Sequence, residues 1–198
     1  MRKLTVGMVA ILGASSAALG ADVVTSEAEF LDVIMDGYYL EDFDAYYYGS
    51  YQEYTLDLAQ GDWAYTISAY GDTMSFLWSG DSCMSTNNAY DGLLVEFTGA
   101  PVTAVGGWFY GSDISGFYIP GPIHIELGDG TEYDFDPTSG EDFRGFVSDV
   151  PIASIWIDAP DTMAITWATM DHFYVGMAVP APGALLLLGL AGLRRRRR

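Results

Sequence analysis

Carboxylates dominate the side chains of this sequence that could do chemistry. The 198 residues include 27 Asp and Glu, but only 8 Lys and Arg, 2 His and 1 Cys. His124, His172 and Cys83 are too few to build a structural zinc site from Cys and His ligands. The chain has no His-Glu-x-x-His motif, no Gly-x-Ser-x-Gly motif and no glycine-rich phosphate loop. We therefore expect a protein that is not an enzyme. A carboxylate-based glycan hydrolase is an alternative, because so many carboxylates allow many acid–base pairs.

Aspartate outnumbers glutamate by 19 to 8, and this asymmetry has two physical explanations. Asp is favoured in turns, which a chain of many strands needs. Asp also supplies the hard oxygen ligands that calcium takes from carboxylates and carbonyls. Calcium is the one cofactor that the sequence suggests, and a dense group of acidic residues provides its candidate ligands: Asp129, Glu132, Asp134 and Asp136. No EF-hand spacing is present, and the alternative is that these residues are solvated turn and strand positions.

Aromatic side chains suggest a different kind of ligand. The sequence has 14 Tyr, 10 Phe and 5 Trp, and tyrosines crowd residues 38–54. Consecutive aromatic residues of a strand cannot all point inward, so part of the run 46–48 is expected to be exposed. Exposed Tyr and Trp rings can stack on sugar rings, and Tyr47 and Trp108 are the candidates for this role. The alternative is that such rings fill the core.

The charges are distributed unevenly along the chain. Arg144 is the only Lys or Arg between residues 4 and 193, whereas all 27 acidic residues lie between Asp22 and Asp171. This body therefore has a formal net charge of −26. Phosphate binding depends on Lys and Arg, so the composition excludes nucleic acid and leaves metal cations, neutral ligands and basic partners. Half of the residues are hydrophobic and 15% are aromatic, so the body is expected to fold around a core.

The elements that must position these residues follow a period of two. Residues 123–127 and 133–135 alternate between apolar and polar around a Gly-Asp-Gly turn, which predicts a hairpin. Similar runs predict strands over residues 54–58, 63–69, 74–78, 93–98, 102–110, 143–148, 152–158, 163–168 and 170–176. Roughly ten short strands separated by turn residues predict that residues 21–177 form one mainly β domain, an antiparallel β-sandwich.

One short helix is expected at the start of this domain. Ser26 and Glu29 form a capping-box pattern. The residues after it are predicted to share one helix face, which Gly37 ends: Phe30, Leu31, Ile34 and Met35.

Both ends of the chain have the composition of targeting segments. Residues 1–20 begin with Arg2 and Lys3, continue with an apolar run and end in small residues, which predicts a secretory signal peptide and export. The tail, residues 178–198, contains a proline motif, an apolar helix over 183–193 and an arginine run. The motif consists of Val179, Pro180, Ala181 and Pro182, and the run of Arg194, Arg195, Arg196, Arg197 and Arg198. We expect this tail to anchor the chain in the inner membrane at least transiently, with the arginines on the cytoplasmic side.

The order Val-Pro-x-Pro, short Leu/Gly/Ala helix and terminal arginine run resembles the PEP-CTERM sorting signal. The resemblance covers about 20 of the 198 residues, and Ala181 replaces the glutamate of the usual motif. It implies processing by exosortase, a membrane transpeptidase-like enzyme, in bacteria that produce exopolysaccharide. The body also resembles the jelly-roll domains that often precede such tails, and these are similar in shape to carbohydrate-binding modules.

The leading hypothesis is an exported, non-catalytic structural or interaction protein of the cell surface or extracellular matrix. The first alternative is a carbohydrate-binding module of that matrix, and the second is the glycan hydrolase. The partners that these hypotheses imply are an exosortase-like enzyme and extracellular polysaccharide.

Overall fold

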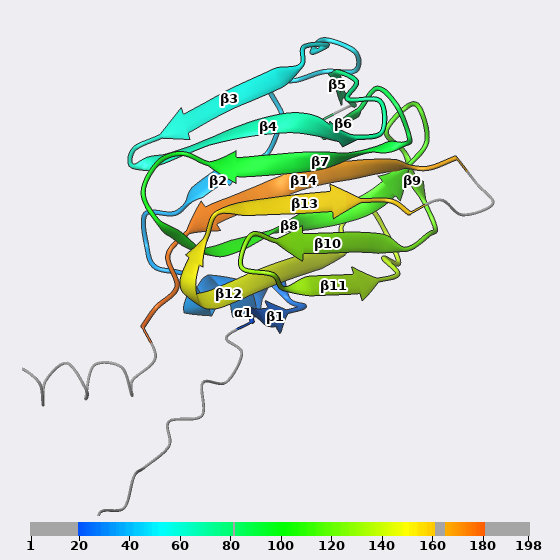
Figure 1. Ribbon diagram of the computed structural model, residues 1–198. Coiled ribbons are helices and arrows are strands. Elements are labelled where there is room, and N and C mark those ends of the chain that lie inside the picture. The colour runs from blue at the N-terminus through cyan, green and yellow to red at the C-terminus, as the bar shows by residue number, and fades with distance from the viewer. Residues whose placement is uncertain (1–19, 81, 161–164, 181–198) are drawn as a thin grey trace, which may run out of the picture.

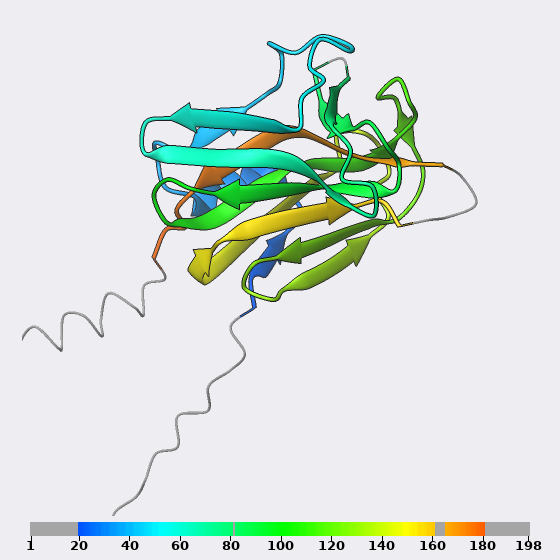
Figure 2. The ribbon, with the colours of Figure 1, turned by 45° about the horizontal axis from the view of Figure 1, so that its top comes forward.

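The computed structural model describes residues 20–80, 82–160 and 165–180. Within them the chain forms two antiparallel β-sheets packed face to face, with one short helix against one sheet (Figure 1, Figure 2). This confirms the predicted mainly β sandwich with one short N-terminal helix. The predicted signal peptide, apart from Gly20, and the tail from Ala181 onward lie outside the described residues.

One sheet has eight strands and the other has six. The eight-stranded sheet contains β1 (Asp22–Val24), β2 (Tyr39–Glu41), β5 (Leu77–Ser79), β6 (Met84–Thr86), β8 (Val102–Ser112), β9 (Tyr118–Ile119), β12 (Phe143–Ile152) and β14 (Trp167–Gly176). The six-stranded sheet contains β3 (Thr55–Gln60), β4 (Trp63–Gly71), β7 (Asp91–Phe97), β10 (Ile123–Leu127), β11 (Glu132–Phe135) and β13 (Ser154–Asp158). The first sheet runs in the order β1-β12-β8-β14-β6-β5, with β2 beside β14 and β9 beside β8. The second runs in the order β11-β10-β13-β7-β4-β3.

The core lies between the two sheets, as the alternation of the sequence requires. Ile67, Val95 and Ile157 fill it from the six-stranded sheet. Val105 and Phe173 fill it from the eight-stranded sheet. Burial of these side chains is the main favourable contribution to folding, at about 25 cal/mol per Å² of apolar surface removed from water. Because the inward positions are apolar, every second residue of each strand is directed to an outer face.

The predicted hairpin is confirmed. Strands β10 and β11 pair antiparallel, with Ile125 opposite Tyr133 and His124 opposite Asp134. The last two predicted strands, in contrast, are represented by one, because β14 begins at Trp167 and continues to Gly176. Residues 163 and 164, with which the first of those two predicted strands began, lie outside the described residues.

The helix α1 (Glu27–Val33) begins where the sequence predicts and ends earlier. Ser26 is the N-cap, and its hydroxyl accepts a hydrogen bond from the Glu29 backbone nitrogen at 3.4 Å. The chain turns extended at Ile34, which forms a β-bridge with Ala178. Pairing with the segment after β14 therefore ends the helix before Gly37.

The prediction of a four-residue apolar face on α1 was wrong in part. Phe30 and Ile34 are buried, whereas Leu31 and Met35 are 37% and 43% exposed. Phe30 packs on the outer side of the eight-stranded sheet, where Gly145 leaves room for its ring. The helix thus covers only one end of that outer face.

Asp91 fixes the loop that leads from β4 into β5. Its buried carboxylate accepts hydrogen bonds from the backbone nitrogens of Thr73 at 2.9 Å, Met74 at 3.2 Å and Ser75 at 2.8 Å, and from the Thr73 hydroxyl at 2.5 Å. Burial alone would raise the pKa of Asp91, but the hydrogen bonds from Thr73 and Ser75 hold it below its ordinary value. The ionised carboxylate therefore positions the start of β5, which carries Trp78.

No helix among the described residues is long and apolar enough to cross a membrane. The apolar helix predicted over 183–193 lies beyond the last described residue, Pro180.

Candidate functional site

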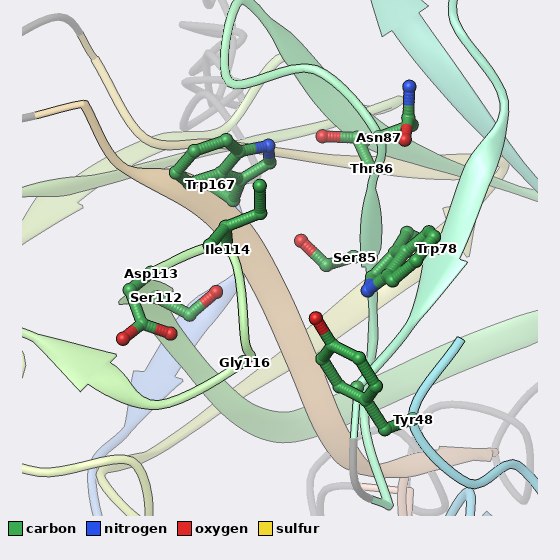
Figure 3. Close-up of a pocket in the computed structure, with 11 residues that line it drawn as sticks. Tyr48, Trp78, Ser85, Thr86, Asn87, Ser112, Asp113, Ile114, Gly116 and Trp167 are labelled. Atoms are coloured by element: carbon green, nitrogen blue, oxygen red, sulfur yellow. The ribbon is translucent and has the colours of Figure 1, made fainter.

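A pocket of about 100 Å³ lies on the outer side of the eight-stranded sheet, over β5, β6, the end of β8 and the start of β14 (Figure 3). Three aromatic residues line it, Tyr48, Trp78 and Trp167. The remaining lining residues are small, polar or aliphatic: Gly80, Ser85, Thr86, Asn87, Ser112, Asp113, Ile114 and Gly116. We refer to it below as the edge pocket.

Strand alternation places two of these side chains on the outer side of the sheet. Leu77 and Met84 are buried in the core, so the next residues, Trp78 and Ser85, point the opposite way. The register sets Ser85 directly between Trp78 on β5 and Thr169 on β14. Three neighbouring strands therefore contribute to one row of outward side chains.

The start of β14 completes the pocket. Trp167 is the register partner of Ser112, the last residue of β8. After Ser112 the chain turns through residues 113–117, where Asp113 Oδ1 accepts hydrogen bonds from the backbone nitrogens of Ser115 at 2.8 Å and Phe117 at 3.1 Å. This turn brings Ile114 to the pocket rim opposite Trp78 (Figure 3).

Buried hydroxyl groups form the floor of the edge pocket. The Ser112 and Thr169 hydroxyl oxygens are 2.6 Å apart, and the Thr169 hydroxyl donates to Ser85 Oγ at 3.2 Å. Ser85 in turn donates to the Ala168 carbonyl at 2.8 Å. In this series of hydrogen bonds, each of the three hydroxyl hydrogens is donated to a protein acceptor. The oxygens of Ser85 and Ser112 therefore keep lone pairs that can accept a hydrogen bond from a ligand in the pocket.

The indole nitrogen of Trp78 is a hydrogen-bond donor that faces the edge pocket. Among the described residues, Trp78 Nε1 is buried and has no hydrogen-bond partner. Figure 3 shows it directed into the pocket, toward the space between the hydroxyls of Tyr48 and Ser85. The Tyr48 ring meets the Trp78 ring edge-on, with centroids 5.5 Å apart. A buried donor left without a partner costs about 1–3 kcal/mol, so an acceptor bound in this pocket would recover that free energy.

Neither aromatic residue that the sequence nominated for sugar stacking lines this pocket. Tyr47 is 72% exposed and precedes the pocket residue Tyr48. Trp108 lies on the outer face of β8, and the His172 ring covers one of its faces, with centroids 4.1 Å apart and planes 8° from parallel. The pocket residues Trp78, Ser85, Ser112 and Trp167 were not among the candidates.

The structure does not bring the four candidate calcium ligands together. Asp129 accepts a hydrogen bond from the Thr131 backbone nitrogen at 2.9 Å, and Asp134 lies 2.7 Å from the His124 ring. Glu132 and Asp136 are exposed. In the three described segments of the chain, no group of three or more His, Cys, Asp or Glu side chains is arranged to hold a metal ion.

The predicted sorting motif begins at the edge of the described region. The Val179 backbone nitrogen donates to the Val33 carbonyl at 2.8 Å, which holds the start of the motif against the end of α1. Pro180 follows it. Ala181, Pro182 and the arginines from Arg194 to Arg198 lie outside the described residues.

Comparison of the chain with protein-family models, with curated proteins and with solved structures found no significant match.

Near the middle of the same outer face, β14 is irregular. The register shifts between Asp171 and Tyr174, and His172 adopts a left-handed backbone with φ of 49°. The Asp171 carboxylate accepts a hydrogen bond from the His172 backbone nitrogen at 2.6 Å. Burial raises the pKa of Asp171 to about 6, and the negative charges of Asp44 and Asp42 add to the effect, against the lowering by His172.

This raised pKa predicts a pH dependence of stability. An aspartate whose pKa is higher in the folded chain than in the unfolded chain loses stabilising free energy as pH rises from about 4 to about 6. We expect Asp171→Asn to remove that loss and to raise the melting temperature at neutral pH relative to wild type, with little change at pH values near 4. Thermal unfolding across this pH range measures the difference. Asp149→Asn, at an exposed position with the same change of charge, is the control, and parallel curves for wild type and Asp171→Asn would contradict the prediction.

Proposed function

We propose that this chain is an exported, non-catalytic protein of the cell surface or matrix that binds carbohydrate in the edge pocket. The observation that carries the proposal is the indole nitrogen of Trp78, which has no hydrogen-bond partner among the described residues and is directed into a pocket with aromatic walls and a hydroxyl floor. Sugars match this arrangement, because a sugar ring has an apolar C–H face for the aromatic side chains and hydroxyls that both donate and accept.

The size and charge of the pocket limit the class of sugar that fits it. A volume of about 100 Å³ is smaller than the roughly 300–1,000 Å³ of pockets that enclose drug-sized ligands, so it suits one sugar ring or the end of a chain. Among the lining residues that the structure describes, Asp113 is the only charged one. None of the described lining residues is a Lys or Arg that could pair with an acidic sugar, and the body as a whole is strongly negative. These features favour a neutral glycan.

A non-catalytic role is supported by the same lining. Glycoside hydrolysis requires two carboxyl groups flanking the scissile bond, and the described lining residues of the edge pocket contain one. That one, Asp113, is already engaged in the 113–117 turn through Oδ1.

The proposal that the protein is displayed at the cell surface rests on the sequences of the two chain ends. The N-terminal 20 residues predict export, and the tail predicts anchoring with sorting by an exosortase-like enzyme. Strand β14 runs from Trp167 at the pocket to Gly176 near the tail, a span of about 30 Å at roughly 3.3 Å per residue. Anchoring through the tail would therefore leave the edge pocket at the end of the domain away from the membrane.

The carbohydrate proposal predicts retardation in affinity electrophoresis through gels that contain a soluble neutral polysaccharide. The probes are laminarin, xylan, galactomannan and hydroxyethylcellulose, with alginate as an acidic comparison. At least one neutral probe is expected to retard the wild-type chain. Trp78→Ala and Trp167→Ala should weaken binding in the edge pocket at least about tenfold, since truncation of a central aromatic side chain costs about 2 kcal/mol or more.

Tyr47→Ala is the matched control, because Tyr47 is exposed and lies outside the pocket. It should migrate like wild type. The proposal fails if no neutral probe retards the wild-type chain, or if the two tryptophan variants are retarded as strongly as wild type while remaining folded.

The tail proposal predicts the mass of the mature protein. Mass spectrometry of the chain isolated from its native envelope is expected to show loss of residues 1–20 and of residues after about Pro182. A mature chain that retains all five terminal arginines would contradict sorting by cleavage and leave a plain membrane anchor.

A further inference from the structure

A second hollow, of about 270 Å³, lies on the outer side of the six-stranded sheet, which is the opposite outer face from the edge pocket. Its lining residues are Tyr70, Leu94, Glu126, Leu127, Gly128, Ser154 and Trp156. Trp156 points outward because its neighbours on β13, Ile155 and Ile157, are buried in the core. Tyr70 points outward next to the buried Ala69. We refer to this hollow as the sheet groove.

Aromatic rings form a strip across the sheet groove. The indole of Trp156 lies over β7, where Gly92 has no side chain: a Cβ at that position would be 2.5 Å from Trp156 Nε1. The rings of Tyr70 and Trp156 meet edge-on with centroids 6.4 Å apart, and the His124 ring is 5.7 Å from Trp156 on the other side. Among the described residues, Trp156 Nε1 is buried and lacks a hydrogen-bond partner.

The charges beside this strip are negative and unbalanced. Glu126 is the register partner of Trp156 on one side and of Glu132 on the other. Two carboxylates directly opposite each other in a sheet repel. None of the ion pairs within the described residues involves Glu126, so its oxygens are available to accept hydrogen bonds from a neutral ligand and would repel an anionic one.

We propose that the sheet groove is a second carbohydrate site, which holds the interior of a neutral glycan chain against Trp156 and Tyr70 with Glu126 accepting from its hydroxyls. The groove has a larger volume than the edge pocket and lies on a sheet face, so it suits a chain that passes through rather than a chain end. The two sites together would let one copy of the protein cross-link two glycan chains. This cross-linking proposal rests on the proposed function of the edge pocket.

Light scattering by mixtures of the full-length chain with a soluble neutral polysaccharide tests cross-linking, and affinity electrophoresis of the same mixtures tests binding. The probe is whichever of laminarin, xylan, galactomannan and hydroxyethylcellulose retards the wild-type chain. The wild-type chain is expected to be retarded in the gel and to raise the light scattering. Trp156→Ala and Trp78→Ala should each still bind, with weaker retardation, but should not raise the scattering. The double variant should neither bind nor raise the scattering.

Tyr70→Ala provides a second test of the groove, because Tyr70 is 51% exposed and its removal should leave the fold intact. Tyr90→Ala is the matched control, since Tyr90 is 58% exposed and lines neither site. It should bind and cross-link like wild type.

The outcomes separate the two proposals. If Trp156→Ala and Tyr70→Ala still cross-link, or if Trp78→Ala alone abolishes all binding, the sheet groove is not a glycan site and the edge pocket is unaffected. If Trp156→Ala alone abolishes binding and Trp78→Ala has no effect, the edge pocket fails and the groove stands. Groove-dependent binding of protonated chitosan only, lost at high salt, would contradict the assignment to a neutral chain.

Discussion

The two-sheet core is the constraint on which the rest of the structure depends. A strand directs successive side chains to opposite faces, so a core filled from one face of each sheet forces an equal number of residues outward. On the eight-stranded sheet α1 covers one end of the outer face, with Phe30 packed over Gly145. The helix does not cover the other end of that face, where the residues that line the edge pocket include Trp78, Ser85, Ser112 and Trp167. The pocket is thus a consequence of the core and of a helix too short to cover the whole sheet.

Local signals in the sequence predicted much of this fold. The alternation around residues 128–130 identified the β10–β11 hairpin, and Ser26 marked the start of α1. Strand β6 could not be identified, because three residues carry no periodicity. The left-handed backbone of His172 and its stacking on Trp108 also depend on neighbours far along the chain.

The edge pocket was harder to predict than the fold, because its members meet only through long-range pairing. Ser85, Ser112 and Thr169 come from three strands and carry no common motif. One signal was available: Leu77 belongs to a predicted strand, so the adjacent Trp78 had to lie on its other face. The tyrosine crowding near residue 47 pointed to the correct region, since Tyr48 lines the pocket.

The structure shows how the excess of negative charge bears on ligand binding. Arg144, the one fixed cation of the body, pairs with Asp142 at 2.5 Å and lies 4.2 Å from the centre of the Phe135 ring. Its side chain is 13% exposed. The described surface therefore offers no free arginine or lysine to an anion, and both hollows combine aromatic rings with hydrogen-bonding groups instead. This combination is the basis for the proposal that neutral glycans bind at both sites.

The most direct measurement of the central claim is the proton–nitrogen NMR spectrum of the tryptophan indole groups during titration with a neutral oligosaccharide prepared from the bound polysaccharide. Trp63 supplies an internal reference, because its Nε1 already donates to the Gly37 carbonyl at 2.7 Å. Binding in the edge pocket predicts a saturable shift of the Trp78 indole signal as it gains an acceptor, while the Trp63 signal stays in place. A Trp78 signal that does not move while the oligosaccharide binds would contradict the account.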